Sequence, residues 1–103
     1  MKNISIKEKL ELKNEVNYQD GQVVSKTLAQ NTSVSVTLFA FDKDEEISSH
    51  KSGGDALITC LECVGRITID EDVYELNEGE SIAMPTGHPH AVYAKEKFKM
   101  LLL

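Results

Sequence analysis

The sequence predicts an all-β fold, an antiparallel β-barrel with little or no helix. Short apolar segments recur along the chain, and turn-forming residues such as Asp20-Gly21, Asn31-Thr32 and Asn77-Glu78-Gly79 separate them. Alternation of side chains is clearest over residues 34–41, and no apolar stripe has helical spacing. Many short strands at regular intervals are typical of a sandwich or barrel. We therefore expect one small barrel with an open mouth.

Length and composition limit the classes of function. A chain of 103 residues with 41% apolar residues can fill one core, so we expect one domain. The net charge of −6 disfavours nucleic acid and anionic membrane surfaces as partners. No apolar run approaches the roughly 20 residues that cross a bilayer. The N-terminus also lacks the apolar centre of a secretory signal, so we expect a cytoplasmic protein.

The order of the elements divides the chain into two parts of that one domain. We expect residues 1–33 to form N-terminal strands or an arm that packs on the barrel or on a dimer partner. Residues 34–103 are expected to form the barrel itself. The predicted strands span 22–29, 34–41, 56–61, 66–70, 73–76, 82–84, 91–94 and 98–103, and from Ile47 the chain carries His50 into a flexible loop at 51–55.

The most informative stretch runs from Gly79 to His90. A strand at 82–84 leads into Pro85, and Gly87 turns the chain. Proline cannot donate to a sheet and glycine permits unusual backbone angles, so this is a sharp corner between two strands. If the chain is extended after the corner, His88 and His90 face the same space. The alternative is a solvated loop histidine beside a hydrogen-bonded core histidine.

Cys60 and Cys63 are too few for a disulfide framework, although their spacing is that of a redox motif. On a strand, residues three apart face opposite sides and lie about 10 Å apart. A disulfide needs Cα atoms within about 7 Å. We therefore expect buried thiols instead of a redox pair.

The chain resembles the cupins, in particular the small single-domain RmlC-like kind. Gly79, Pro85, Gly87 and His90 match the spacing of the second cupin motif, whose final asparagine is replaced by Ala94. His50 stands at the first histidine of the first motif, and 61–63 stand where that motif ends. The resemblance covers about residues 34–103. It implies a double-stranded jelly roll, a cupin-type antiparallel barrel.

The same resemblance implies a divalent metal held by histidines and a glutamate. His50 and His90 match ligand positions, whereas Ser52 replaces the second histidine and Ala56 replaces the glutamate. The metal, expected as zinc, iron, manganese or nickel, is therefore absent or held by other donors. If Ala56 faces inward, the parity of its strand turns Cys60 inward as well. The candidate metal ligands are His50, His90 and His88, with Cys60 as a further donor.

Three functions remain open. The first is an enzyme in which a metal acts as a Lewis acid on a small oxygenated substrate. The second is a metal-free module that binds a small polar ligand. The third is a structural or sensory homodimer. The expected pocket residues are His50, Ser52, Ile58, Cys60, Met84, His88 and His90, with Val36 and Met100 as further apolar wall.

The homodimer hypothesis rests on apolar side chains on both faces of the 34–41 strand. The stripe of Val34, Val36, Leu38 and Ala40 is expected to face the interior. Phe39 and Phe41 then lie on the outer face, with Leu57 and Leu61 on the neighbouring strand. Such a face is covered either by a second copy or by the N-terminal arm of the same chain.

Overall fold

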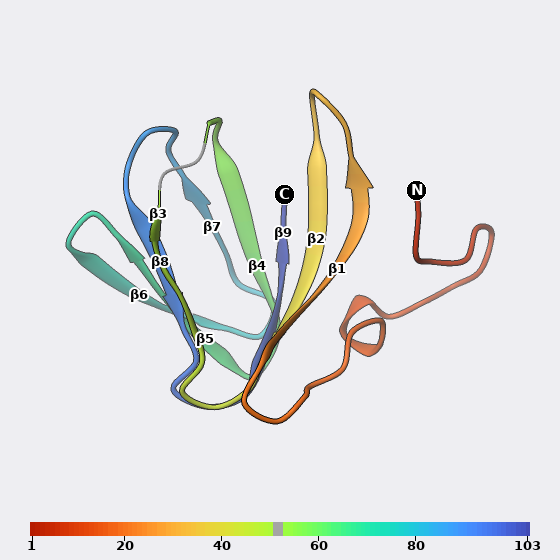
Figure 1. Ribbon diagram of the computed structural model, residues 1–103, viewed down its shortest axis with the longest axis horizontal. Helices are drawn as coiled ribbons and strands as arrows, with labels where there is room; N and C mark the ends of the chain where they lie inside the picture. Colours follow the sequence, from red (N-terminus) through yellow and green to blue (C-terminus); the bar gives the residue numbers. More distant parts are fainter. Residues whose placement is uncertain (51–52) are drawn as a thin grey trace.

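The protein is a sandwich of two antiparallel sheets with an N-terminal arm on one outer face (Figure 1). The computed structural model describes residues 1–50 and 53–103, and the side chains of Ser49 and His50 lie outside what it describes. The all-β prediction is confirmed, since the described residues form nine strands and one short 3-10 helix, η1. No helix in this described part of the chain is long and apolar enough to cross a membrane.

The strand bounds follow the sequence prediction closely, except for the strand at Glu46–His50, which the sequence did not predict. The helix η1 spans Leu12–Asn14. The strands are β1 (Val23–Gln30), β2 (Ser35–Phe41), β3 (Glu46–His50), β4 (Ala56–Glu62), β5 (Val64–Ile69), β6 (Asp72–Asn77), β7 (Ser81–Met84), β8 (His90–Tyr93) and β9 (Phe98–Leu102). The strands predicted at 66–70 and 73–76 form a hairpin, β5–β6, where Asp70 takes the positive φ of 55° that its short turn requires.

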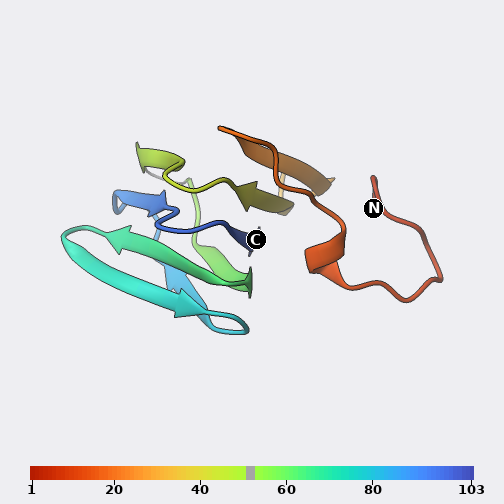
Figure 2. The same ribbon diagram turned by 90° about the horizontal axis from the view of Figure 1, so that it is seen from below.

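The chain passes back and forth between two sheets, as in a jelly roll. Sheet A has the strand order β1-β2-β9-β4-β7, and sheet B has the order β3-β8-β5-β6. Figure 1 shows the two sheets converging at the lower end and spreading apart toward the end that carries the β7–β8 corner. Seen from below, the arm extends away from the body of the sandwich beside β1 (Figure 2).

The main core fills the space between the sheets. Phe41 and Phe98 stack at its closed end, with ring centroids 4.7 Å apart. Gly65 of β5 lies against this pair so closely that a Cβ atom there would be 2.3 Å from the Phe98 ring. A glycine is therefore needed at this position for sheet B to approach sheet A. The remaining members are Ile58, Cys60, Ile67, Ile69, Leu76, Met84, Val92, Ala94 and Met100.

A second apolar cluster lies on the outer face of sheet A. Leu38 and Ala40 of β2 are fully buried there under Val16 of the arm, with Leu28 of β1. Residues packed around them come from both the arm and the sheet: Ile4, Leu12, Tyr18, Val24, Val36, Leu61 and Leu101. The arm thus covers much of the outer face of sheet A, and backbone Lys2 N–H also donates to the Leu28 carbonyl of edge strand β1.

The predicted orientation of β2 is wrong. Phe39 and Phe41 pack against the interior, whereas Val36, Leu38 and Ala40 belong to the outer cluster. Val36 is therefore no part of the interior wall. Both faces of β2 are covered by apolar layers, so its alternation marks two faces without showing which is inside. The prediction for β4 holds, since Ala56, Ile58 and Cys60 all contact the inner cluster.

Candidate ligand cavity and its histidine

A cavity of about 240 Å³ lies between the two sheets. Sheet A contributes residues of β2, β4, β7 and β9 to its wall, and sheet B contributes residues of β3 and β8. The described lining residues are Phe39, Ile47, Ile58, Met84, His90, Val92, Met100 and Leu102. Three of the expected pocket residues, Ile58, Met84 and His90, are among them. Small-molecule sites are commonly apolar cavities of this kind with a few polar groups.

His90 reaches the cavity because the chain becomes extended only at that residue. The corner from Pro85 to Pro89 includes Gly87 at a φ of 76°, and β8 begins at His90. Alternation along β8 then turns His90 and Val92 inward. The side chain of His90 is 4% exposed. It is the one polar side chain among the described residues of the wall.

The backbone of His50 pairs directly with that of His90. The two residues are register partners across the antiparallel strands β3 and β8. Opposite residues on such strands have Cα atoms about 4.5–5.5 Å apart. The two motif histidines, forty positions apart in the sequence, are thus neighbours in sheet B. The side chain of His50 and the whole of Ser52, both expected in the pocket, lie outside the described residues.

His88 does not line the cavity. Its side chain is 52% exposed, and its Nδ1 lies 2.8 Å from a carboxylate oxygen of Asp70. The reason is local, because His88 is still within the corner and the alternation that would align it with His90 has not begun. The corner is also held from the other side, where backbone Thr86 N–H donates to the carboxylate of Asp55 at 2.9 Å.

The comparisons with known proteins decide the family. Residues 37–103 match the family model described as a cupin domain. The chain belongs to the cupin family. A search of curated proteins found no match.

Solved structures agree with this assignment. A conserved protein of unknown function from Streptococcus pyogenes is 45% identical, with a TM-score of 0.94 over 97% of this chain and 88% of that one. A cupin superfamily protein from Desulfitobacterium hafniense is 32% identical, with a TM-score of 0.93 over 98% and 93% of the two chains. An RmlC-like cupin from Desulfovibrio desulfuricans is 24% identical, has a TM-score of 0.75 over 84% and 85%, and supports the fold alone.

The donors among the described residues of this cupin do not make up a transition metal site of the usual kind. Such sites use three or four protein ligands. No group of three or more His, Cys, Asp or Glu residues that could hold a metal occurs within the described part of the chain. Among the described residues of the cavity wall, His90 is the one with an imidazole, thiol or carboxylate side chain. His50, its register partner, is the one further motif histidine whose backbone lies beside it. Ala56, at the position of the family glutamate, has no donor atom.

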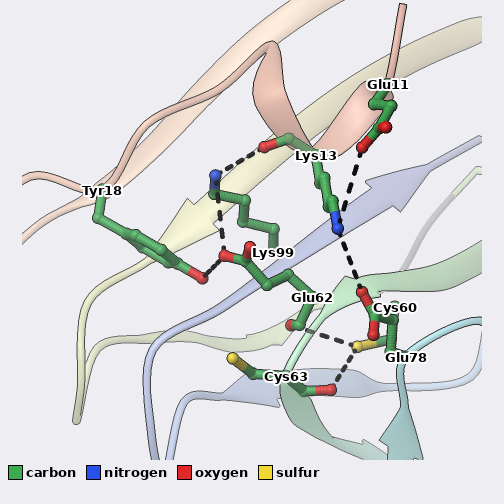
Figure 3. Close-up of polar contacts among 8 residues, drawn as sticks. All are labelled: Glu11, Lys13, Tyr18, Cys60, Glu62, Cys63, Glu78 and Lys99. Carbon is green, nitrogen blue, oxygen red and sulfur yellow. Dashed lines mark hydrogen bonds and ion pairs between the residues drawn. The ribbon is translucent and has the colours of Figure 1, made fainter.

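Cys60 is inside the sandwich but is not among the residues that line the cavity. Its thiol donates to the backbone carbonyls of Cys63 at 3.2 Å and Glu62 at 3.6 Å, near the start of β5 (Figure 3). Burial raises the pKa of the Cys60 thiol. A neutral thiol with carbonyl acceptors is a poor metal ligand, because the thiolate is the ligand form. The carbonyl of Cys63, not its thiol, faces Cys60.

The sequence did not single out Phe39, Ile47, Val92 or Leu102 as cavity residues. Val92 and Leu102 have the inward parity of His90 and Met100, so a strict count of alternate positions would have found them. The alternation of β2 predicts Phe39 on the outer face, whereas it lines the cavity. The orientation of β2 required knowledge of what covers each side.

Proposed function

We propose that this cupin binds a small organic molecule in the cavity between its sheets, with His90 as the hydrogen-bonding group. The supporting observation is a cavity of about 240 Å³ in which the buried imidazole of His90 stands among apolar walls. A neutral imidazole has one donor and one acceptor nitrogen, and a hydrogen bond from either of them orients a ligand. The apolar wall contributes affinity through buried area.

A substitution that fills the cavity tests whether ligands bind there. Val92→Phe adds a ring at the cavity wall, while Val73→Phe makes the same change on an exposed strand position. We expect Val92→Phe to abolish the shifts that a mixed library of polar, charged and apolar fragments produces in the methyl signals of Met84 and Met100. Val73→Phe should leave them unchanged. If no fragment of any class shifts these signals in the unmodified protein, the proposal fails.

The binding we propose needs no metal. Zinc, iron, manganese and nickel remain predictions from the family resemblance, and the direct pairing of His50 with His90 is the observation that favours them. Two imidazoles are fewer than the three or four ligands of established sites. Elemental analysis of untagged protein should find less than about a tenth of an equivalent of any of these metals after reloading. Stoichiometric metal would overturn the metal-free form of the proposal.

The homodimer also stays a prediction, on a changed basis. Phe39 and Phe41 are interior, and Leu61 lies with the arm in the outer cluster. The larger apolar residues left around an outer groove at sheet A are Val34, Leu57 and Leu103, of which Val34 is 49% exposed. Light scattering at micromolar concentration should give twice the mass of one chain. A monomer would remove the prediction. The cytoplasmic location likewise remains a prediction.

A further inference from the structure

The described part of the cavity wall is almost entirely apolar, which restricts the chemistry of a ligand that fits inside. The described wall consists of aliphatic, thioether and aromatic side chains around the single imidazole of His90. A ligand hydroxyl that loses water and gains no partner costs about 1–3 kcal/mol. A sugar or polyol has more hydroxyls than one imidazole can satisfy. The described wall thus selects against a sugar or other strongly polar ligand, the kind that the sequence suggested for a metal-free module.

The cavity also disfavours a charged ligand. A carboxylate buried without a cationic partner carries a large desolvation cost. The described residues of the wall include no lysine or arginine. The whole chain also carries a net charge of −6, which repels anions. An uncharged ligand avoids both costs.

The volume of the cavity limits the size of the ligand. An engineered apolar cavity of about 150 Å³ holds benzene. A space of about 240 Å³ therefore accommodates a six-membered ring with a small substituent. Met84 and Met100 are unbranched and adapt to the shape of a ring, and sulfur–aromatic contacts contribute about 0.3–1.5 kcal/mol each.

We infer that the ligand is an uncharged molecule with a cyclic hydrocarbon body and one hydroxyl or carbonyl group, which bonds to His90. This inference rests on the proposed function, because it specifies the ligand of the same cavity. The ring lies between the methionines of sheet A and the apolar side chains of β3 and β8, and the polar group points to the imidazole.

The test uses four probes of related size: phenol, benzene, benzoate and ribose. The chain has three methionines, and their methyl signals report the position of binding. Phenol should shift the signals of Met84 and Met100 and leave that of Met1, which is 70% exposed. Benzene should bind about 2- to 10-fold more weakly, because it lacks one hydrogen bond. Benzoate and ribose should produce no saturable shift.

Three variants test whether the imidazole of His90, and not that of His88 in the corner, bonds to the ligand. His90→Leu should weaken phenol binding to the level of benzene, and His90→Gln, which keeps a donor and an acceptor, should retain part of the difference. His88→Leu removes an imidazole outside the cavity and should leave all affinities unchanged.

The outcomes distinguish this inference from the proposed function. Saturable cavity binding of ribose or benzoate as tight as that of phenol overturns the ligand class and leaves the cavity as a binding site. Equal affinity for phenol and benzene in the unmodified protein overturns the role of His90. The absence of any cavity binding, with these probes and with the mixed library, overturns the function and the inference together.

Discussion

The ammonium group of Lys99 lies 2.6 Å from the backbone carbonyl oxygen of Lys13, so the central strand of sheet A is bonded directly to the arm that covers it (Figure 3). The side chain of Lys99 is 8% exposed and lies 3.8 Å from the carboxylate of Glu62. Tyr18 completes the cluster, since its hydroxyl donates to Glu62 and its ring lies under the lysine, 4.9 Å from ring centre to Nζ. These contacts attach the arm to the outer face of sheet A.

Replacing this lysine should loosen the arm. Lys99→Met keeps the aliphatic stem and leaves the Lys13 carbonyl without its donor and Glu62 without its cation. We expect a loss of about 1–3 kcal/mol in the free energy of unfolding, measured by urea denaturation. Lys97→Met is the matched control, because Lys97 also lies over the Tyr18 ring and is exposed. It should change stability by less than about 0.5 kcal/mol. Equal effects of the two substitutions would contradict this account of Lys99.

The stability of the protein should fall in alkaline solution, in part through Tyr18. Burial, followed by the hydrogen bond and negative charge of Glu62, raises the pKa of Tyr18 above its ordinary value of 10.0. Above that pH the unfolded chain releases a proton that the folded protein keeps, so unfolding becomes more favourable as the pH rises. The contribution is fully present below about pH 10 and is lost above it.

Tyr18→Phe isolates this effect. The variant should lose stability less steeply than the unmodified protein between about pH 9.5 and 11, as followed by urea denaturation. Part of the decline should remain, since the hydrogen bond to Asp44 raises the pKa of Tyr93 and burial raises that of Cys60. Identical slopes for the two proteins would show that Tyr18 titrates alike in the folded and unfolded chains.

Gly65→Ala should strain the closed end of the core. The added methyl group would overlap the ring of Phe98, which is stacked on Phe41 and has no room to withdraw. We expect a loss of about 1–3 kcal/mol, measured as the free energy of unfolding. Gly53→Ala serves as control, because a Cβ atom there would meet nothing within 4 Å. A neutral Gly65→Ala variant would mean that the two sheets separate more easily than this packing indicates.

The two cysteines should differ sharply in reactivity. Cys63 is exposed, whereas Cys60 is buried and donates its thiol hydrogen to backbone carbonyls. Iodoacetamide should therefore modify Cys63 in the folded protein and reach Cys60 only after unfolding, as followed by mass spectrometry. Recovery of a Cys60–Cys63 disulfide from the folded protein under mild oxidation would instead restore the redox interpretation.

Local patterns in the sequence predict much of this structure. The corner at Pro85 and Gly87, the β5–β6 hairpin and the inward parity of Ile58 and His90 depend on residues close together in the chain, whose backbone preferences are expressed in any context. The same reasoning failed for His88, where one condition, an extended chain, was not met. Because His88 still lies within the corner, its imidazole contacts Asp70 instead of lining the cavity.

From the sequence alone came most of the strands and turns, the cupin resemblance and the choice of His90 as a candidate pocket residue. Only the tertiary structure decided that Phe39 and Phe41 face inward and that Tyr18, Glu62 and Lys99 meet beneath the arm. The physical reason is that alternation divides a strand into two faces, whereas the layer packed on each face determines which is the interior. That layer comes from segments distant in the chain, and no periodicity within β2 contains information about them.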